Sequence, residues 1–458
     1  MSVDAEPADE RPPLVLPVSQ RPAPVTPAER VTAVDVLRGV ALLGILPMNI
    51  VGFAWPFTAY FDPTAGGGFA GLDRVIWIVC HIVFDQKMLT IFSMLFGAGL
   101  VLMGNRAEAR GRSIRSIYYR RVLWLLAIGM VHAYLIWDGD ILVTYAQCGL
   151  LLFLFRRLSP RTLIILGASL ILLAALIGFG FSVGIEFVRD TAAAAAVAKQ
   201  AGEKPTRLQS ALRDAWEQGL RAEFDPSPEQ RAKTRNEEIA IYRDGYLGIV
   251  LQRSPHLFIM HTVAFVMVLM WGIGGRMLIG MGLMKLGVFA AARSARFYVG
   301  LTALSYGLGL PLVAYDTIAL IDRGFAAPTL LRSKMAYNEI GSVLVALGHV
   351  GVVMLVVRAG LLSGLTRRLV AVGQMALTNY LTHSLVCTTI FYGYGFGLFA
   401  TINRTGLTGI VLAIWAVQLF VSPLWLARFR FGPAEWVWRS LTYWRLQPMR
   451  LSSVAERA

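Results

Sequence analysis

Ten long apolar stretches divide this chain, and each is close to the length that a membrane-spanning helix needs. A hydrocarbon core about 30 Å thick takes about 20 apolar residues of helix. Hydrophobic residues make up 56% of the sequence. The pattern predicts an all-α, polytopic transmembrane bundle of about ten spans, over residues 36–57, 88–104, 119–137, 140–156, 162–183, 256–280, 296–316, 334–358, 369–392 and 407–427.

The distribution of arginine supports this count. Lys and Arg gather after the second, fourth, sixth, eighth and tenth stretches, whereas the turn Asp138-Gly139-Asp140 carries only acidic side chains. By the positive-inside rule, this asymmetry places both termini in the cytoplasm. The apolar segment 72–86 would put the arginine-rich loop 106–121 on the wrong side if it were a span. We therefore expect an interfacial or re-entrant helix there.

The polar segments suggest how the chain is organised around the membrane. Residues 1–32 are rich in Pro, Glu and Ala, and we expect a disordered cytoplasmic tail. Two transmembrane halves, 33–183 and 256–431, flank a polar helical insertion at 184–255. That insertion is expected outside, as a lid, a partner site or a solvated spacer. Residues 432–458 alternate aromatic residues with arginines, as in an amphipathic helix that anchors at the interface.

The net charge of +15 does not indicate a nucleic-acid partner. Most of the excess lies in loops assigned to the cytoplasmic side, where it meets anionic lipid headgroups. Membrane lipids are thus expected partners, nucleic acid is not, and a homo-oligomer is left open. The three cysteines, Cys80, Cys148 and Cys387, lack metal-ligand spacing, and HExxH, Walker and GxSxG motifs are missing from the sequence. We predict neither a metal nor a resident cofactor.

Polar side chains inside apolar spans mark candidate sites, because they are costly in a bilayer. The first span carries Asp35, Arg38 and Asn49, which the helical period places in one stripe. Arg38 is expected to hold an anionic group such as a phosphate at the cytoplasmic mouth. Alternatively, Asp35 and Arg38 form an ion pair that anchors the helix, and Asn49 packs between helices.

The third span ends with His132, directly before the acidic turn that contains Asp138 and Asp140. A nearby carboxylate fixes the tautomer of an imidazole and raises its pKa, so His132 is the predicted general base or acyl acceptor. The structural alternative is a histidine hydrogen-bonded between helices, with the aspartates capping the next helix. His256 and His261 are five residues apart and do not share a face of an α-helix cleanly.

Two further groups receive weaker functional assignments. His81 and Asp85 share a helical face and suit a proton-shuttling pair, with Lys87 close by, although such ion pairs are usually inert. In the ninth span, Asn379 and His383 form a polar stripe that Gln374 precedes. Substrate binding and simple interhelical hydrogen bonding both explain that stripe.

Several segments together resemble the YeiB family of bacterial inner-membrane proteins, whose last third is a C-terminal domain of unknown function. The segments are Asp35-Val36-Leu37-Arg38-Gly39, Lys87-Met88-Leu89-Thr90-Ile91-Phe92-Ser93-Met94-Leu95-Phe96-Gly97, His132 with Trp137-Asp138-Gly139-Asp140-Ile141-Leu142, Gly373-Gln374-Met375-Ala376-Leu377-Thr378-Asn379-Tyr380, and Phe431-Gly432-Pro433-Ala434-Glu435-Trp436 with Arg439-Ser440-Leu441-Thr442. The resemblance implies a multi-pass protein of the bacterial inner membrane.

The amino-terminal half is also similar to the catalytic domain of heparan-α-glucosaminide N-acetyltransferase and related transmembrane acyltransferases. That similarity implies transfer of an acyl group from cytosolic acyl-CoA, as co-substrate, to a hydroxyl or amine of a sugar or lipid at the outer face. The acetyltransferase uses a histidine in its first outer loop, where this chain offers only His81. Two other classes stay open: a transporter or flippase of an anionic or lipid-linked small molecule, and a scaffold without a substrate.

Overall fold

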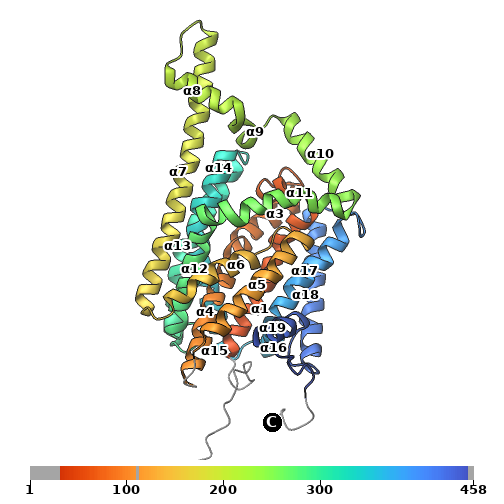
Figure 1. Cartoon of the computed structure of the whole chain (residues 1–458). Coiled ribbons are helices and arrows are strands. Elements are labelled where there is room, and N and C mark those ends of the chain that lie inside the picture. Colours follow the sequence, from red (N-terminus) through yellow and green to blue (C-terminus); the bar gives the residue numbers. More distant parts are fainter. Residues whose placement is uncertain (1–30, 110–112, 452–458) are drawn as a thin grey trace, which may run out of the picture.

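The computed structural model describes residues 31–109 and 113–451, so nearly all of the predicted tail 1–32 lies outside the described residues. Within these ranges the protein is a helical bundle without β-strands (Figure 1). An isolated antiparallel bridge pairs Phe429 with Arg450. The predicted all-α class is confirmed.

The first transmembrane half contains long helices interrupted by short π-helical turns. Its elements are α1 Thr32–Ala54, α2 Phe57–Phe61, α3 Gly71–Val79, η2 Cys80–Phe84, α4 Lys87–Ala109, α5 Arg115–Val131, η3 His132–Ile136, α6 Leu142–Leu152, η4 Phe153–Phe155 and α7 Pro160–Gln200. At 1.5 Å per residue α7 is about 60 Å long, twice the hydrocarbon thickness. Its second half extends beyond the bundle to α8 (Figure 1).

The polar insertion is helical and is followed by the second transmembrane half. The insertion comprises the end of α7, α8 Arg207–Ala215, η5 Trp216–Leu220, α9 Arg221–Phe224, α10 Pro228–Asp244 and the start of α11 Tyr246–Ile259. The second half comprises η6 Met260–Leu269, α12 Met270–Lys285, α13 Ala295–Asp322, α14 Ala327–Arg332, η7 Ser333–Tyr337, α15 Asn338–Arg358, α16 Ser363–Gln374, α17 Ala376–Phe391, α18 Arg404–Leu426 and α19 Pro433–Tyr443.

Eight helices in the described ranges are long and apolar enough to cross a membrane, and they coincide with eight of the predicted stretches. The other two differ in length or continuity: 140–156 forms only the short helix Leu142–Phe155, and 369–392 is broken at Met375. Segment 72–86 forms α3 and η2, which are followed by a turn at Asp85 and Gln86 and then by α4, within a 36-residue apolar stretch, Gly71–Arg106. Its interfacial or re-entrant placement stays a prediction.

Small residues bring α1 and α16 into close contact, which matters for the site below. A Cβ atom on Gly39 would lie 2.2 Å from the Leu369 carbonyl oxygen, and one on Gly373 would lie 2.0 Å from that of Asp35. Only glycine permits such an approach, as is typical of membrane helix pairs. The contact places Arg38 beside Gln374.

Different helices lie at the two ends of the bundle. Helices α8, α9 and α10 lie at one end of the molecule, and α16 and α19 lie at the opposite end (Figure 1). We call these the α10 end and the α19 end. The candidate site is described below from the α19 end to the α10 end.

Candidate functional site

Two cavities follow one another along α4 and α6. The cavity at the α19 end has a volume of about 270 Å³ and includes four arginines in its wall, so we call it the arginine cavity. The other has a volume of about 310 Å³, and its wall is rich in aromatic rings, so we call it the aromatic cavity. On α4, Phe92 lines the arginine cavity and Leu89 lines the aromatic cavity, less than one helical turn apart.

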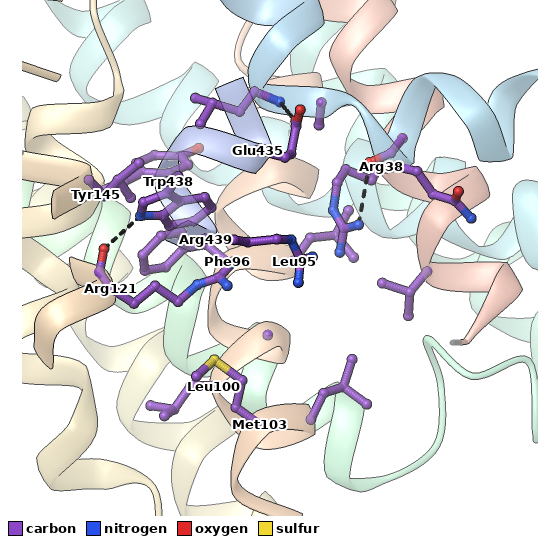
Figure 2. Close-up of a pocket in the computed structure, with 18 of the residues that line it drawn as sticks. Arg38, Leu95, Phe96, Leu100, Met103, Arg121, Tyr145, Glu435, Trp438 and Arg439 are labelled. Atoms are coloured by element: carbon purple, nitrogen blue, oxygen red, sulfur yellow. Dashed lines mark hydrogen bonds between the residues drawn. The ribbon is translucent and has the colours of Figure 1, made fainter. Parts of the chain in front are cut away.

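The arginine cavity collects basic side chains from four elements. They are Arg38 from α1, Arg106 from α4, Arg121 from α5 and Arg439 from α19, against the carboxylates of Asp35 and Glu435. Figure 2 shows Arg38, Arg121 and Arg439 directed towards one shared space. This lining carries two more cationic than anionic side chains, so it favours an anionic ligand.

The predicted pair Asp35 and Arg38 lies in this cavity together with Gln374. Arg38 donates to the Asp35 carboxylate at 2.6 Å, and the Gln374 amide donates to the same carboxylate at 3.4 Å. The Arg38 side chain remains 28% exposed, so its guanidinium is both oriented and open to the cavity. Asn49 does not join them, because it lines the aromatic cavity. The predicted stripe on α1 is thus divided between the two cavities.

Helix α19 forms part of the arginine cavity, although the sequence indicated only an anchor. Glu435 accepts hydrogen bonds from the backbone N–H groups of Leu377 at 2.6 Å and Thr378 at 3.2 Å, and from the Thr378 hydroxyl at 2.6 Å. The carboxylate therefore caps the first turn of α17, directly after the break at Met375. Burial raises the pKa of Glu435. Trp438 donates to the Arg121 carbonyl and lies 3.9 Å below its guanidinium (Figure 2).

We expect Glu435→Ala to lower the free energy of unfolding by about 2–3 kcal/mol, because it removes three hydrogen bonds to a buried carboxylate and uncaps α17. The measurement is the thermal unfolding midpoint of the purified protein in detergent. Glu237→Ala is the matched control, since Glu237 is exposed on α10 and pairs only loosely with Lys233 at 4.0 Å. A Glu435→Ala protein that unfolds at the wild-type temperature would contradict this role.

The aromatic cavity is acidic. Asp138 and Glu238 both line it, and burial raises the pKa of each carboxyl group. Glu238 belongs to α10 and accepts a hydrogen bond from the backbone N–H of Phe57 at 2.9 Å. Through Glu238 and Tyr242, the polar insertion covers this cavity directly. The sequence contained no signal for the role of Glu238, which stands in a run of charged residues.

Two histidines that seemed misaligned in the sequence both line the aromatic cavity. His256 lies in α11 and His261 in the π-helical segment η6. Both line the cavity although η6 begins only at Met260, so most of the interval between the two histidines is α-helical. His261 is 9% exposed, and its Nδ1 atom is buried without a partner among the described residues. An unpaired buried nitrogen of this kind suits a ligand that donates or accepts a proton.

Helix α6 contributes to the walls of both cavities. Its residues Thr144 and Tyr145 line opposite cavities. The Tyr145 hydroxyl is 2.7 Å from the Ser93 hydroxyl. Tyr380 lines the arginine cavity, accepts from the backbone N–H of Ile141 at 3.3 Å and donates to the Gly139 carbonyl at 3.4 Å. Adjacent residues of α6 thus line different cavities, and the side chains between these two spaces form a partition.

The predicted base His132 is 1% exposed and lines neither of these cavities among the residues described. Its Nδ1 atom is 2.6 Å from the Asp140 carboxylate, and its Nε2 atom is 2.8 Å from the Ser384 hydroxyl. Asp140 also accepts from the backbone N–H of Val143 at 2.8 Å, at the start of α6. The order Ser–His–Asp resembles a hydrolase triad, but Ser384 is fully buried. This geometry favours a buried cross-link that supports the acidic turn.

His81, Asp85 and Lys87 lie in a buried charged cluster beside the aromatic cavity, and none of the three is part of its described wall. Asp85 is 3.1 Å from His81 Nδ1 and accepts from Lys334 at 2.8 Å. Lys87 donates to the His81 carbonyl and to Asn338, each at 2.8 Å. With Asp316, whose carboxylate lies 3.5 Å from His81 Nε2, the cluster holds two lysines against two carboxylates and joins the first transmembrane half to η7 and α15.

Asn379 and His383 face α18 rather than a cavity. His383 Nε2 is 2.8 Å from the Gln418 side-chain oxygen, and the Asn379 amide donates to Ser422 at 3.1 Å. Both contacts are interhelical hydrogen bonds, one of the two explanations that the sequence left open for this stripe. No cluster of three or more His, Cys, Asp or Glu side chains suited to a metal occurs in residues 31–109 and 113–451.

Fold and site together define a polytopic helical membrane protein with a basic and an acidic cavity that meet at one short helix. The chain is 32% identical over 441 residues to the uncharacterized protein YxaH of Bacillus subtilis (strain 168), covering 93% of this chain and 97% of that protein. It is 30% identical over 425 residues to the uncharacterized protein YeiB of Escherichia coli (strain K12), covering 90% and 96%. The chain belongs to the YeiB family.

Other comparisons agree with this membership. The family model described as a protein of unknown function, DUF418, matches residues 283–445. An uncharacterized 39.9 kDa protein of Bacillus acidopullulyticus is 25% identical over 433 residues, covering 94% of this chain and 99% of that protein. No solved structure matches the chain. The predicted family is confirmed, and these relatives leave the reaction open.

Proposed function

We propose that this protein is a transmembrane acyltransferase that binds acyl-CoA in the arginine cavity and an acceptor in the aromatic cavity. One observation carries the proposal. Neighbouring residues of α4 and α6 line a basic and an acidic cavity, so a donor in one cavity and an acceptor in the other are held on the two sides of the same helices. Such proximity is what acyl transfer across a membrane requires.

The dimensions of the arginine cavity suit a donor with a charged head and a long arm. Its wall on α4 extends from Arg106 to Phe92, which is about 21 Å of helix. Arginines gather near one end, and the walls towards the partition are apolar, with Leu95, Phe96 and Leu125 among them. Acyl-CoA carries phosphates at one end and its thioester at the end of a flexible arm. The planar guanidinium group of arginine binds such phosphates through two parallel hydrogen bonds.

His261 is the group best placed to accept the proton of the acceptor. The hydroxyl or amine attacks the thioester carbonyl, a new C–O or C–N bond forms, and the C–S bond breaks. His261 Nδ1 takes the proton that the nucleophile loses and returns one to the departing thiolate, so atoms and charge balance. This replaces His132 with His261 as the proposed base, because both ring nitrogens of His132 already have partners.

The orientation follows from the arginines. With the α19 end in the cytoplasm, the arginine cavity opens to cytosolic acyl-CoA, and the basic residues around α16 and α19 obey the positive-inside rule. The aromatic cavity and α10 then face the outside of the bacterial inner membrane. A transporter or flippase is the second candidate, since a partition between two cavities also suits alternating access.

Inside-out membrane vesicles that contain the protein separate these two functions. We expect acetyl-CoA labelled in its acetyl group to release free CoA thiol and to transfer label to vesicle lipid or to a lumenal small molecule, one thiol for each label. Vesicles from cells without the protein are the control. Uptake of intact label without release of thiol would support the transporter, and neither uptake nor release with acetyl-CoA or a longer acyl-CoA would overturn the acyltransferase.

A further inference from the structure

The aromatic cavity has a charge that selects its ligand. Asp138 and Glu238 line it, and its described wall contains neither Lys nor Arg. Asp140 also belongs to the wall, and its carboxylate lies 2.6 Å from His132 Nδ1. The carboxylates of Asp138 and Glu238 thus face a space of about 310 Å³, which is large enough for a small organic molecule. A cationic ligand would compensate them.

Aromatic rings surround the same space, and several are fixed in place. Trp55 donates its indole N–H to the Ile402 carbonyl at 2.9 Å. Trp137 stacks on Phe53 with 3.8 Å between ring centroids, and Tyr242 stacks on Phe399 at 4.6 Å. The rings of Phe57 and Tyr60 complete this side of the wall. Aromatic faces attract ammonium groups, and aromatic cages are the usual receptors for quaternary ammonium ligands.

His261 supplies a third element of recognition. Its Nδ1 atom is buried and without a partner in the described part of the chain, and the residue lines the cavity. A buried nitrogen without a hydrogen bond is costly unless a ligand satisfies it. A hydroxyl or N–H group on the ligand would do so.

The nearest cationic side chains are already occupied and stand outside the wall. Arg253 donates to the carbonyl oxygens of Tyr134 and Ile136. Lys334 donates to Asp85 at 2.8 Å and approaches the Tyr60 ring at 5.4 Å from its centroid. Both lower the negative potential of the cavity without filling it. Protonation of His256 or His261 would act in the same direction.

We infer that the aromatic cavity binds a small organic ammonium compound that also carries a hydroxyl or N–H group. The carboxylates of Asp138 and Glu238 and the aromatic faces hold the cation, and His261 bonds the hydroxyl or N–H group. That this compound is the acyl acceptor rests on the proposed function. Its binding does not, because binding needs no acyl donor.

The test compares choline with its neutral isostere 3,3-dimethylbutan-1-ol by isothermal titration calorimetry on the full chain in nanodiscs. We expect choline to bind at least about tenfold more tightly than the isostere, a ratio that corresponds to a cation–π and carboxylate contribution. Ethanolamine is the second probe and distinguishes a primary from a quaternary ammonium. Glu238→Gln and Asp138→Asn should each weaken choline binding about three- to tenfold.

Glu237→Gln is the matched control, because Glu237 neighbours Glu238 on α10 but lies outside the cavity wall. Its affinity for choline should equal that of the wild type. Equal binding of choline and the isostere, or no binding of choline or ethanolamine by folded protein, would overturn the inference. Choline binding without any thiol release from acyl-CoA would support the ammonium site while refuting the acyltransferase. Thiol release without ammonium binding would do the opposite.

Discussion

Replacing His261 with glutamine is expected to lower the rate of acyl transfer by about 10²–10⁴-fold, the usual contribution of a general base. Glutamine keeps a hydrogen-bonding side chain of similar length, yet it cannot take up a proton at the partition. Binding of the donor should be unchanged, because His261 lies in the aromatic cavity and the arginines lie in the other. The measurement is thiol release per folded molecule, with acyl-CoA affinity determined on the same sample.

His132→Gln is the comparison that makes this result decisive. It disturbs the contacts of the imidazole with Asp140 at 2.6 Å and Ser384 at 2.8 Å, so we expect a lower unfolding temperature. Transfer per folded molecule should largely persist. A folded His132→Gln protein without transfer, together with a fully active His261→Gln protein, would return the catalytic role to His132.

Replacing Arg121 with alanine is expected to weaken the binding of CoA and acyl-CoA by at least about tenfold, since a hydrogen bond to a charged group contributes about 1.5–3 kcal/mol. Arg121 belongs to α5 and lines the arginine cavity, and its guanidinium stacks 3.9 Å from the ring of Trp438 on α19. Calorimetry with CoA alone measures the effect without any chemistry.

Two further variants separate charge from packing at this position. Arg121→Lys should recover part of the affinity, because it keeps the charge but not the planar fork. Arg367→Ala removes an exposed arginine of α16 that lies outside the cavity wall, and should bind CoA as the wild type does. If a folded Arg121→Ala protein bound CoA with wild-type affinity, the arginine cavity would not be the donor site.

The sequence predicted some of the site residues and missed others. Asp35 and Arg38 were predicted at a site for an anionic group, and Gln374 was predicted beside a stripe that substrate binding or interhelical hydrogen bonding would explain. The structure places all three in one cavity. Their polarity inside apolar spans was the signal. His256 and His261 were set aside because the period of an α-helix separates them. The structure places both in the wall of the aromatic cavity, because side chains from several helices enclose it and a shared face of one helix is not required.

Hydrophobicity and charge alone determined that this chain is an all-α membrane protein, because a bilayer accepts only segments that satisfy their own backbone groups. Only the tertiary structure decided which polar residues meet. Glu435 reaches across to cap α17, and Glu238 comes from a polar insertion to complete the aromatic cavity. Contacts between residues 58 positions apart, or between α10 and α2, depend on packing between helices. Such packing produces no periodic pattern in the sequence of either helix from which the contact could be predicted.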